Sequence, residues 1–149
     1  MALDTLGLLK CAVQGTSVSE QGKSVSVKPI PGETVLFFRS DTPEFRACTR
    51  LEQNAAACDV MIFYYKSPKA VICFVELKGS EIEKGRRQIQ ATHDAFRAAT
   101  QGGEPLGITW IGIVITTKGS TINRPRKESK TALKIVETKN PDIGDILRK

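Results

Sequence analysis

The sequence lacks the motifs of several common catalytic classes. Its four cysteines include no C-x-x-C pair, it has one histidine, and it has no glycine-rich nucleotide-binding loop. We find neither a zinc cluster nor a Ser-His-Asp arrangement. The cysteines are therefore interpreted as buried small hydrophobic residues in a reducing compartment. His93 is interpreted as a structural residue.

Long apolar runs are also absent. No run approaches the roughly 18 residues that indicate a membrane span, and residues 1–10 lack the basic-then-apolar pattern of a secretory signal. The chain has 149 residues and is 40% hydrophobic, which suits one domain with a real core. We expect a soluble cytoplasmic protein without a membrane partner, with residues 1–149 forming a single domain.

Positive charge exceeds negative charge. Lysine and arginine total 22 against 16 acidic residues, and the net charge of +6 favours polyanionic partners. Residues 118–149 form a basic C-terminal segment, and the bases concentrate between residues 118 and 134, at Lys118, Arg124, Arg126, Lys127, Lys130 and Lys134. Such a run is more typical of a solvated loop, and it gains weight as a binding surface only beside a nucleic-acid site.

The amino-terminal third has mixed signals. Residues 3–13 predict a short amphipathic helix capped by Asp4. Residues 24–28 alternate as a strand with one wet face, and residues 33–39 follow turn-forming residues and predict another strand. Residues 44–57 permit a helix, but we favour a strand followed by a turn.

The middle of the chain is clearer. Residues 59–65 and 70–78 are rich in strand formers, and their short connection requires an antiparallel hairpin. A capping box of Ser80 and Glu83 starts a helix that Gly102 and Gly103 end. Residues 108–116 predict a strand buried on both faces, residues 132–138 a further strand, and the last nine residues a short helix. The fold class is α/β, a mixed β-sheet flanked by helices.

Three charges converge at one end of the predicted hairpin. Pairing around the turn sets Asp59 opposite Glu76, and the alternation of a strand sets Glu76 and Lys78 on one face. Adjacent carboxylates repel each other, and a divalent cation with oxygen ligands relieves the repulsion. Lys78 is then placed to orient a water molecule or to stabilise developing negative charge.

These residues resemble the PD-(D/E)xK nuclease superfamily, through "CDVMIFYYKSPKAVICFVELKG" at residues 58–79. The resemblance implies a restriction-endonuclease-like core of αβββαβ order, with the motif region at residues 45–117. It implies that Asp59, Glu76 and the Leu77 carbonyl hold Mg²⁺ or Mn²⁺ and that Lys78 acts on the attacking water. It also implies that Gln88 supports the site from the following helix.

The match also has departures and one open position. Cys58 precedes Asp59 where the motif has proline, and Thr92 follows Gln88 where some branches have an aromatic residue. An upstream acid is common in the family. Glu52 is our tentative candidate for it, with Glu44 as the alternative.

The expected activity is that of a metal-dependent endonuclease that hydrolyses phosphodiester bonds in nucleic acid, with DNA favoured over RNA and a homodimer expected. The alternative is a catalytically silent protein of the same fold that binds nucleic acid or acts as a regulatory subunit. The candidate residues for nucleic-acid binding lie in the helix after the motif and in the basic C-terminal segment. They are Lys84, Arg86, Arg87, Arg124, Arg126 and Lys127.

Overall fold

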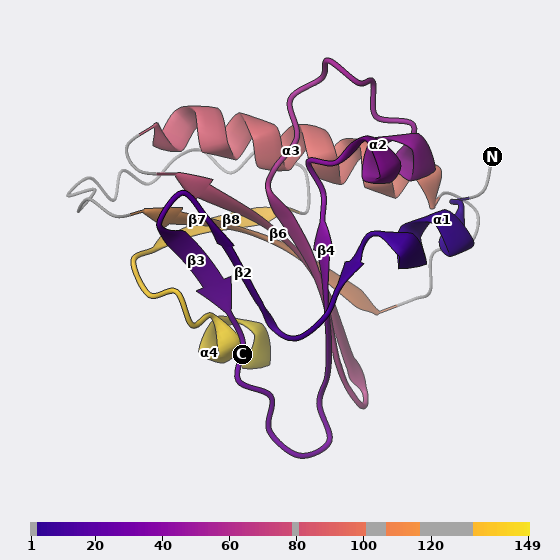
Figure 1. Ribbon diagram of the computed structural model, residues 1–149. Coiled ribbons are helices and arrows are strands. Elements are labelled where there is room, and N and C mark those ends of the chain that lie inside the picture. Colours follow the sequence, from indigo (N-terminus) through magenta and orange to yellow (C-terminus); the bar gives the residue numbers. More distant parts are fainter. Residues whose placement is uncertain (1–2, 79–80, 101–106, 117–132) are drawn as a thin grey trace.

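The fold is built on a mixed six-stranded sheet. The computed structural model describes residues 3–78, 81–100, 107–116 and 133–149. The strand order is β1-β4-β5-β6-β7-β8, in which β1 to β6 pair antiparallel and β6, β7 and β8 pair parallel (Figure 1). The strands are β1 (Ala12–Val13), β4 (Thr34–Arg39), β5 (Val60–Lys66), β6 (Lys69–Lys78), β7 (Ile108–Thr116) and β8 (Lys134–Thr138).

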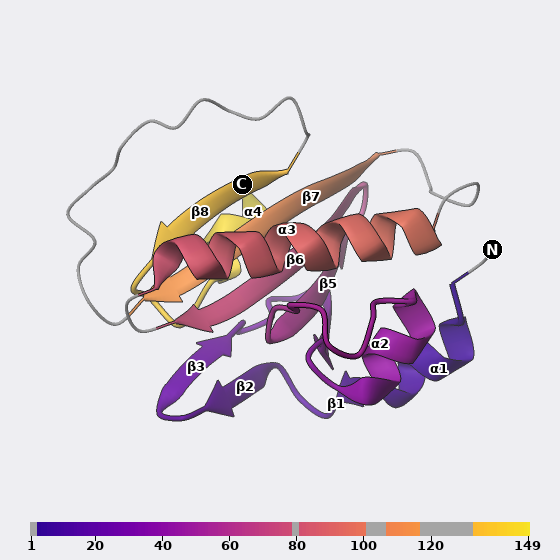
Figure 2. The same cartoon turned by 90° about the horizontal axis from the view of Figure 1, so that it is seen from above.

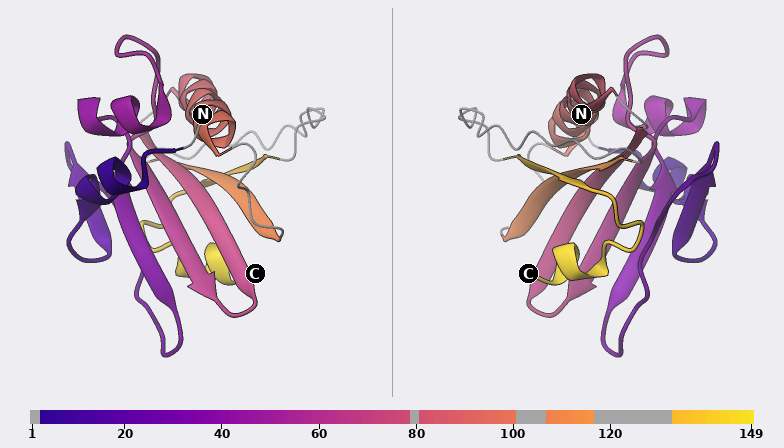
Figure 3. Two further views of the ribbon diagram at one scale, coloured as in Figure 1. Left: turned by 90° about the vertical axis from the view of Figure 1, so that its right-hand side faces the viewer. Right: turned by 90° about the vertical axis from the view of Figure 1, so that its left-hand side faces the viewer.

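The helices and a separate two-stranded ribbon cover both faces of this sheet. Helix α3 lies across one face, and α4 lies on the other (Figures 2 and 3). The remaining elements are α1 (Thr5–Lys10), the ribbon of β2 (Ser17–Glu20) and β3 (Lys23–Ser26), α2 (Pro43–Thr49), α3 (Ile82–Ala99) and α4 (Gly144–Arg148). The expectation of an α/β fold with a mixed sheet flanked by helices is confirmed.

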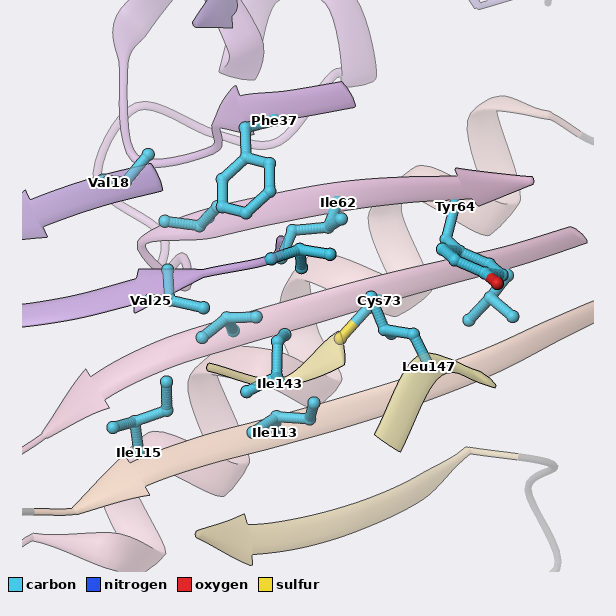
Figure 4. Packing of buried hydrophobic residues seen from close by; sticks show 14 of the residues in the cluster. Val18, Val25, Phe37, Ile62, Tyr64, Cys73, Ile113, Ile115, Ile143 and Leu147 are labelled. Atoms are coloured by element: carbon cyan, nitrogen blue, oxygen red, sulfur yellow. The ribbon is translucent and has the colours of Figure 1, made fainter. Parts of the chain in front are cut away.

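Two apolar clusters hold these layers together. On the α3 face, Phe45 of α2 and Phe96 of α3 pack with Phe74 of the sheet. On the opposite face, the ribbon and α4 pack against β5, β6 and β7 through the residues in Figure 4, which include Val18, Val25, Ile143 and Leu147. Burial on both faces explains the continuous apolar character of β6 and β7.

The central hairpin has the predicted register. Val60 pairs with Val75 and Lys66 with Lys69, so the register is constant along the whole hairpin. Helix α3 then returns the chain to β7, which runs parallel to β6, as a crossover requires. Its buried residues recur at helical spacing on one face: Gly85, Ile89, Thr92, His93, Phe96 and Ala99.

One element differs from the sequence-based expectation. The strand favoured within residues 44–57 is wrong, because Pro43–Thr49 is helix α2. Local capping explains the difference: the Thr42 hydroxyl accepts from the Phe45 N–H, Pro43 opens the first turn, and Arg50 ends the helix with a φ of 60°.

The other expected elements are present with adjusted ends. The first helix ends at Lys10, and Ala12–Val13, expected to belong to it, is strand β1 instead. Asp4 caps the helix by accepting from the Gly7 N–H at 3.0 Å. Helix α3 begins at Ile82 with Glu81 at its N-cap, whereas Ser80 lies outside the described residues. Within the described part of the chain, no helix is long and apolar enough to cross a membrane.

Candidate metal centre

The candidate site lies where the β5–β6 hairpin opens toward α3. Asp59 immediately precedes β5, and its backbone N–H donates to the Val75 carbonyl at 3.1 Å. Its side-chain Oδ2 accepts from the Leu77 N–H at 2.8 Å. The hairpin therefore places the Asp59 carboxylate beside the Glu76–Lys78 segment, as the pairing argument predicts.

Glu76 is the buried acid of this segment. Its residue is 1% exposed, and it pairs with Val114 of the neighbouring strand β7. The fully buried Cys58 thiol lies near both acids. Burial raises the pKa of that thiol to about 12, and the carboxylates of Glu76 and Asp59 add to the effect. Cys58 is therefore a protonated thiol, in agreement with the interpretation of the cysteines as inert core residues.

Two further acids meet Asp59. Glu20 at the end of β2 and Asp41 just beyond β4 each bring a carboxylate oxygen to the site. These oxygens and one of Asp59 all lie within 4.8 Å of one another. Glu20 stands at the tip of the β2–β3 ribbon, where Gln21 and Gly22 both have positive φ, 49° and 77°, as a tight hairpin turn requires.

The electrostatics of this carboxylate group, Glu20, Asp41 and Asp59, favour added positive charge. Burial raises the pKa of Glu20, and the carboxylates of Asp59 and Asp41 raise it further. Burial and then Asp59 likewise raise the pKa of Asp41. The Oε2 atom of Glu20 is buried and has no hydrogen-bond partner among the described residues. Like charges held this close are stabilised by a proton or by a cation.

Sequence reasoning missed both Glu20 and Asp41. Neither residue belongs to the D…ExK pattern, and Glu20 reaches the site through a ribbon that does not pair with the main sheet. Asp41 could have been found from the β4–β5 register. Arg39 pairs with Val60, so the chain just after β4 runs beside Asp59.

The remaining predicted site residues lie in different places. Gln88 lies on α3, where its Nε2 donates to the Ala57 carbonyl at 3.3 Å, so it contacts the backbone that leads into Asp59. Lys78 ends β6, and the prediction for its side chain stays a prediction. Glu52 is exposed in the turn after α2, and the carboxylate group of the described residues does not include it. The alternative, Glu44, is exposed in the first turn of α2.

The predicted nucleic-acid contacts divide into three kinds. Arg86 pairs with Glu137 at 2.9 Å and so ties α3 to β8. Lys84 and Arg87 are exposed and line a shallow depression at the start of α3, where Lys84 lies 3.8 Å from Glu81. Arg124, Arg126 and Lys127 lie outside the described residues.

Comparison of the chain with models of protein families, with curated proteins and with solved structures finds no match in any of the three.

Proposed function

We propose that the protein is a metal-dependent nuclease that hydrolyses phosphodiester bonds in nucleic acid, with DNA favoured over RNA. The observation that carries the proposal is the placement of the Asp59 carboxylate. It accepts from the N–H of Leu77, the residue after Glu76, and lies within 4.8 Å of carboxylate oxygens of Glu20 and Asp41 from distant segments. Oxygen-rich groups of this kind suit hard divalent cations.

The arrangement of the elements supports a restriction-endonuclease-like core. Strands β4, β5 and β6 form an antiparallel meander, α3 crosses over, and β7 returns parallel to β6. Helix α1 precedes them, which gives an αβββαβ order within the chain, with β1, the β2–β3 ribbon, α2, β8 and α4 as additions. In this frame, Asp59 and Glu76 lie at the ends of the second and third strands of the meander.

The carboxylate group fits Mg²⁺ or Mn²⁺. The buried Oε2 of Glu20 lacks a hydrogen-bond partner among the described residues, and burial and neighbouring carboxylates raise the pKa values of Glu20 and Asp41, which supports a role for a bound cation there. We assign Asp59 as the central ligand, with Glu20 and Asp41 beside it. Glu76 and the Leu77 carbonyl are the ligands that the motif adds.

The chain's own groups then have distinct roles. A bound divalent cation supplies a more acidic water and a polarised phosphoryl oxygen. Asp59 is held in a fixed orientation by the Leu77 N–H, so it does not need to reorganise when substrate binds. Lys78 is assigned to orient the attacking water and to stabilise negative charge on the phosphate. Lys84 and Arg87, exposed at the start of α3, are assigned to phosphates further along the strand.

The proposal is tested with labelled duplex, single-stranded, branched and circular DNA, and with RNA, each incubated with Mg²⁺, Mn²⁺ or EDTA. We expect products that require the metal and that disappear in both Glu76→Gln and Lys78→Ala. Asp145→Asn is the control, because that carboxylate is 95% exposed on the terminal helix. Salt-sensitive binding without products from any substrate would instead support the silent, binding-only alternative.

A further inference from the structure

The backbone on either side of the Cys58–Asp59 peptide is fully engaged. The Cys58 N–H donates to the Thr92 hydroxyl at 2.9 Å, and the Cys58 carbonyl accepts from the Ser40 hydroxyl at 2.7 Å. The Asp59 N–H donates to Val75, and the Asp59 carbonyl accepts from the Ser40 N–H, both at 3.1 Å. All four polar backbone groups of these two residues therefore have protein partners.

Two of these bonds come from side chains in different elements. Thr92 lies on α3 and is 1% exposed, and Ser40 follows β4 and is 0% exposed. The Thr92 hydroxyl also donates its proton to the Gln88 carbonyl at 2.8 Å, so its oxygen acts purely as an acceptor toward the Cys58 N–H. Together the two hydroxyls fix Cys58 from the helix side and from the sheet side.

We propose that Thr92 and Ser40 are positioning residues that hold the Asp59 carboxylate in its ligating orientation by fixing the backbone of Cys58. The value of that orientation for metal binding rests on the proposed function. The link is geometric: the Asp59 Oδ2 reaches the Leu77 N–H at 2.8 Å only while the preceding peptide keeps its place.

The chemistry at position 58 is consistent with this role. Proline, which the motif has before its aspartate, carries no N–H and has a fixed φ. Cys58, unlike proline, has a backbone N–H and no ring that fixes its φ. The Thr92 hydroxyl accepts the hydrogen bond from this N–H. A second buried threonine, Thr49 on α2, serves as a contrast, because its hydroxyl donates within its own helix to the Phe45 carbonyl at 2.9 Å.

The test compares Thr92→Val, Thr92→Ser and Ser40→Ala with Thr49→Val as the matched control. Two readouts are used: hydrogen exchange of the Leu77 amide relative to the slowest core amides, and Mn²⁺ affinity by calorimetry. We expect Thr92→Val to speed exchange at Leu77 by about tenfold and to weaken Mn²⁺ binding by about tenfold or more, as loss of a group that orients a ligand does. Thr92→Ser keeps the hydroxyl and should match the wild type in both readouts. Thr49→Val should change neither.

The proposal is overturned if the Leu77 amide and the Mn²⁺ affinity in Thr92→Val match those in Thr49→Val. If Thr92→Val does not fold, Ser40→Ala decides, because it removes the contacts of the hydroxyl with the Cys58 carbonyl and thiol and keeps the bond from the Ser40 N–H to the Asp59 carbonyl. If the wild-type protein binds no Mn²⁺, the proposed function fails, whereas exchange at Leu77 still decides whether Thr92 and Ser40 position Asp59.

Discussion

An ion pair between Glu33, the residue before strand β4, and Arg148 joins the sheet to the terminal helix α4. The Glu33 side chain is 0% exposed and accepts from Arg148 Nε at 2.8 Å and from Nη2 at 2.9 Å. It also accepts from the Tyr64 hydroxyl and from the Ile30 N–H, and Arg148 donates to the Lys28 carbonyl. We predict that Glu33→Gln destabilises the fold, because it removes the buried carboxylate charge and leaves the guanidinium only the exposed Asp145 as an acidic partner among the described residues.

The magnitude follows from the pKa of Glu33. The hydrogen bonds from Arg148, more than any other contact, lower that pKa from its ordinary 4.5 to about 2. A difference of this size corresponds to about 3 kcal/mol of stability. Because the Arg148 side chain is 26% exposed, solvent screening reduces the expected loss to about 2 kcal/mol.

The lowered pKa of Glu33 determines how its contribution to stability changes with pH. The unfolded chain binds the proton near pH 4.5 and the folded chain near pH 2, so the contribution is full above pH 4.5 and is lost as the pH falls toward 2. Urea unfolding of the wild type and of Glu33→Gln should therefore differ by about 2 kcal/mol near neutral pH, and the difference should shrink below about pH 4.5.

Asp145→Asn is the matched control, since Asp145 also lies near Arg148, at 3.6 Å, but is 95% exposed. It should change stability by less than about 0.5 kcal/mol. A Glu33→Gln protein as stable as the wild type near neutral pH, or a difference that does not depend on pH, would refute the reasoning.

Two further predictions concern the site and the core. Glu20→Gln and Asp41→Asn should each stabilise the metal-free protein by about 1 kcal/mol and weaken Mn²⁺ binding, because their raised pKa values mean that ionisation opposes folding. Urea unfolding with and without Mn²⁺ measures both effects, and destabilisation of the metal-free form would contradict the prediction. Gly112→Ala should cost about 1–3 kcal/mol in thermal unfolding, because its β-carbon would lie 2.7 Å from Ile89 Cγ2 and 3.0 Å from Ile135 Cγ1. Unchanged stability would show that α3 shifts freely over β7.

The sequence predicts the middle of the fold well because its signals there are local. The short turn between β5 and β6 leaves one possible register, and the apolar run at residues 108–116 coincides with β7. The helix at Pro43–Thr49 was missed although its signals are equally local. Thr42 before Pro43 is a helix start, and the strand-like character of residues 46–52 obscured it.

The site is only half visible in the sequence for a different reason. Asp59 and Glu76 belong to one hairpin, so their apposition follows from pairing alone. Glu20 and Asp41 meet Asp59, but not Glu76, in one carboxylate group through the tertiary arrangement of the β2–β3 ribbon and the end of β4, which no spacing rule encodes. The hydroxyls of Thr92 and Ser40 are invisible to motif reasoning, because their partner is backbone rather than another side chain.

The most direct test of the central claim is Mn²⁺-dependent cleavage of DNA by the wild type, Asp59→Asn and Asp145→Asn, purified in parallel and assayed on the same labelled strands. We expect the wild type and Asp145→Asn to cut, EDTA to stop them, and Asp59→Asn to fold without cutting. Cutting by Asp59→Asn at the wild-type rate would contradict the assignment of this hairpin as the catalytic site.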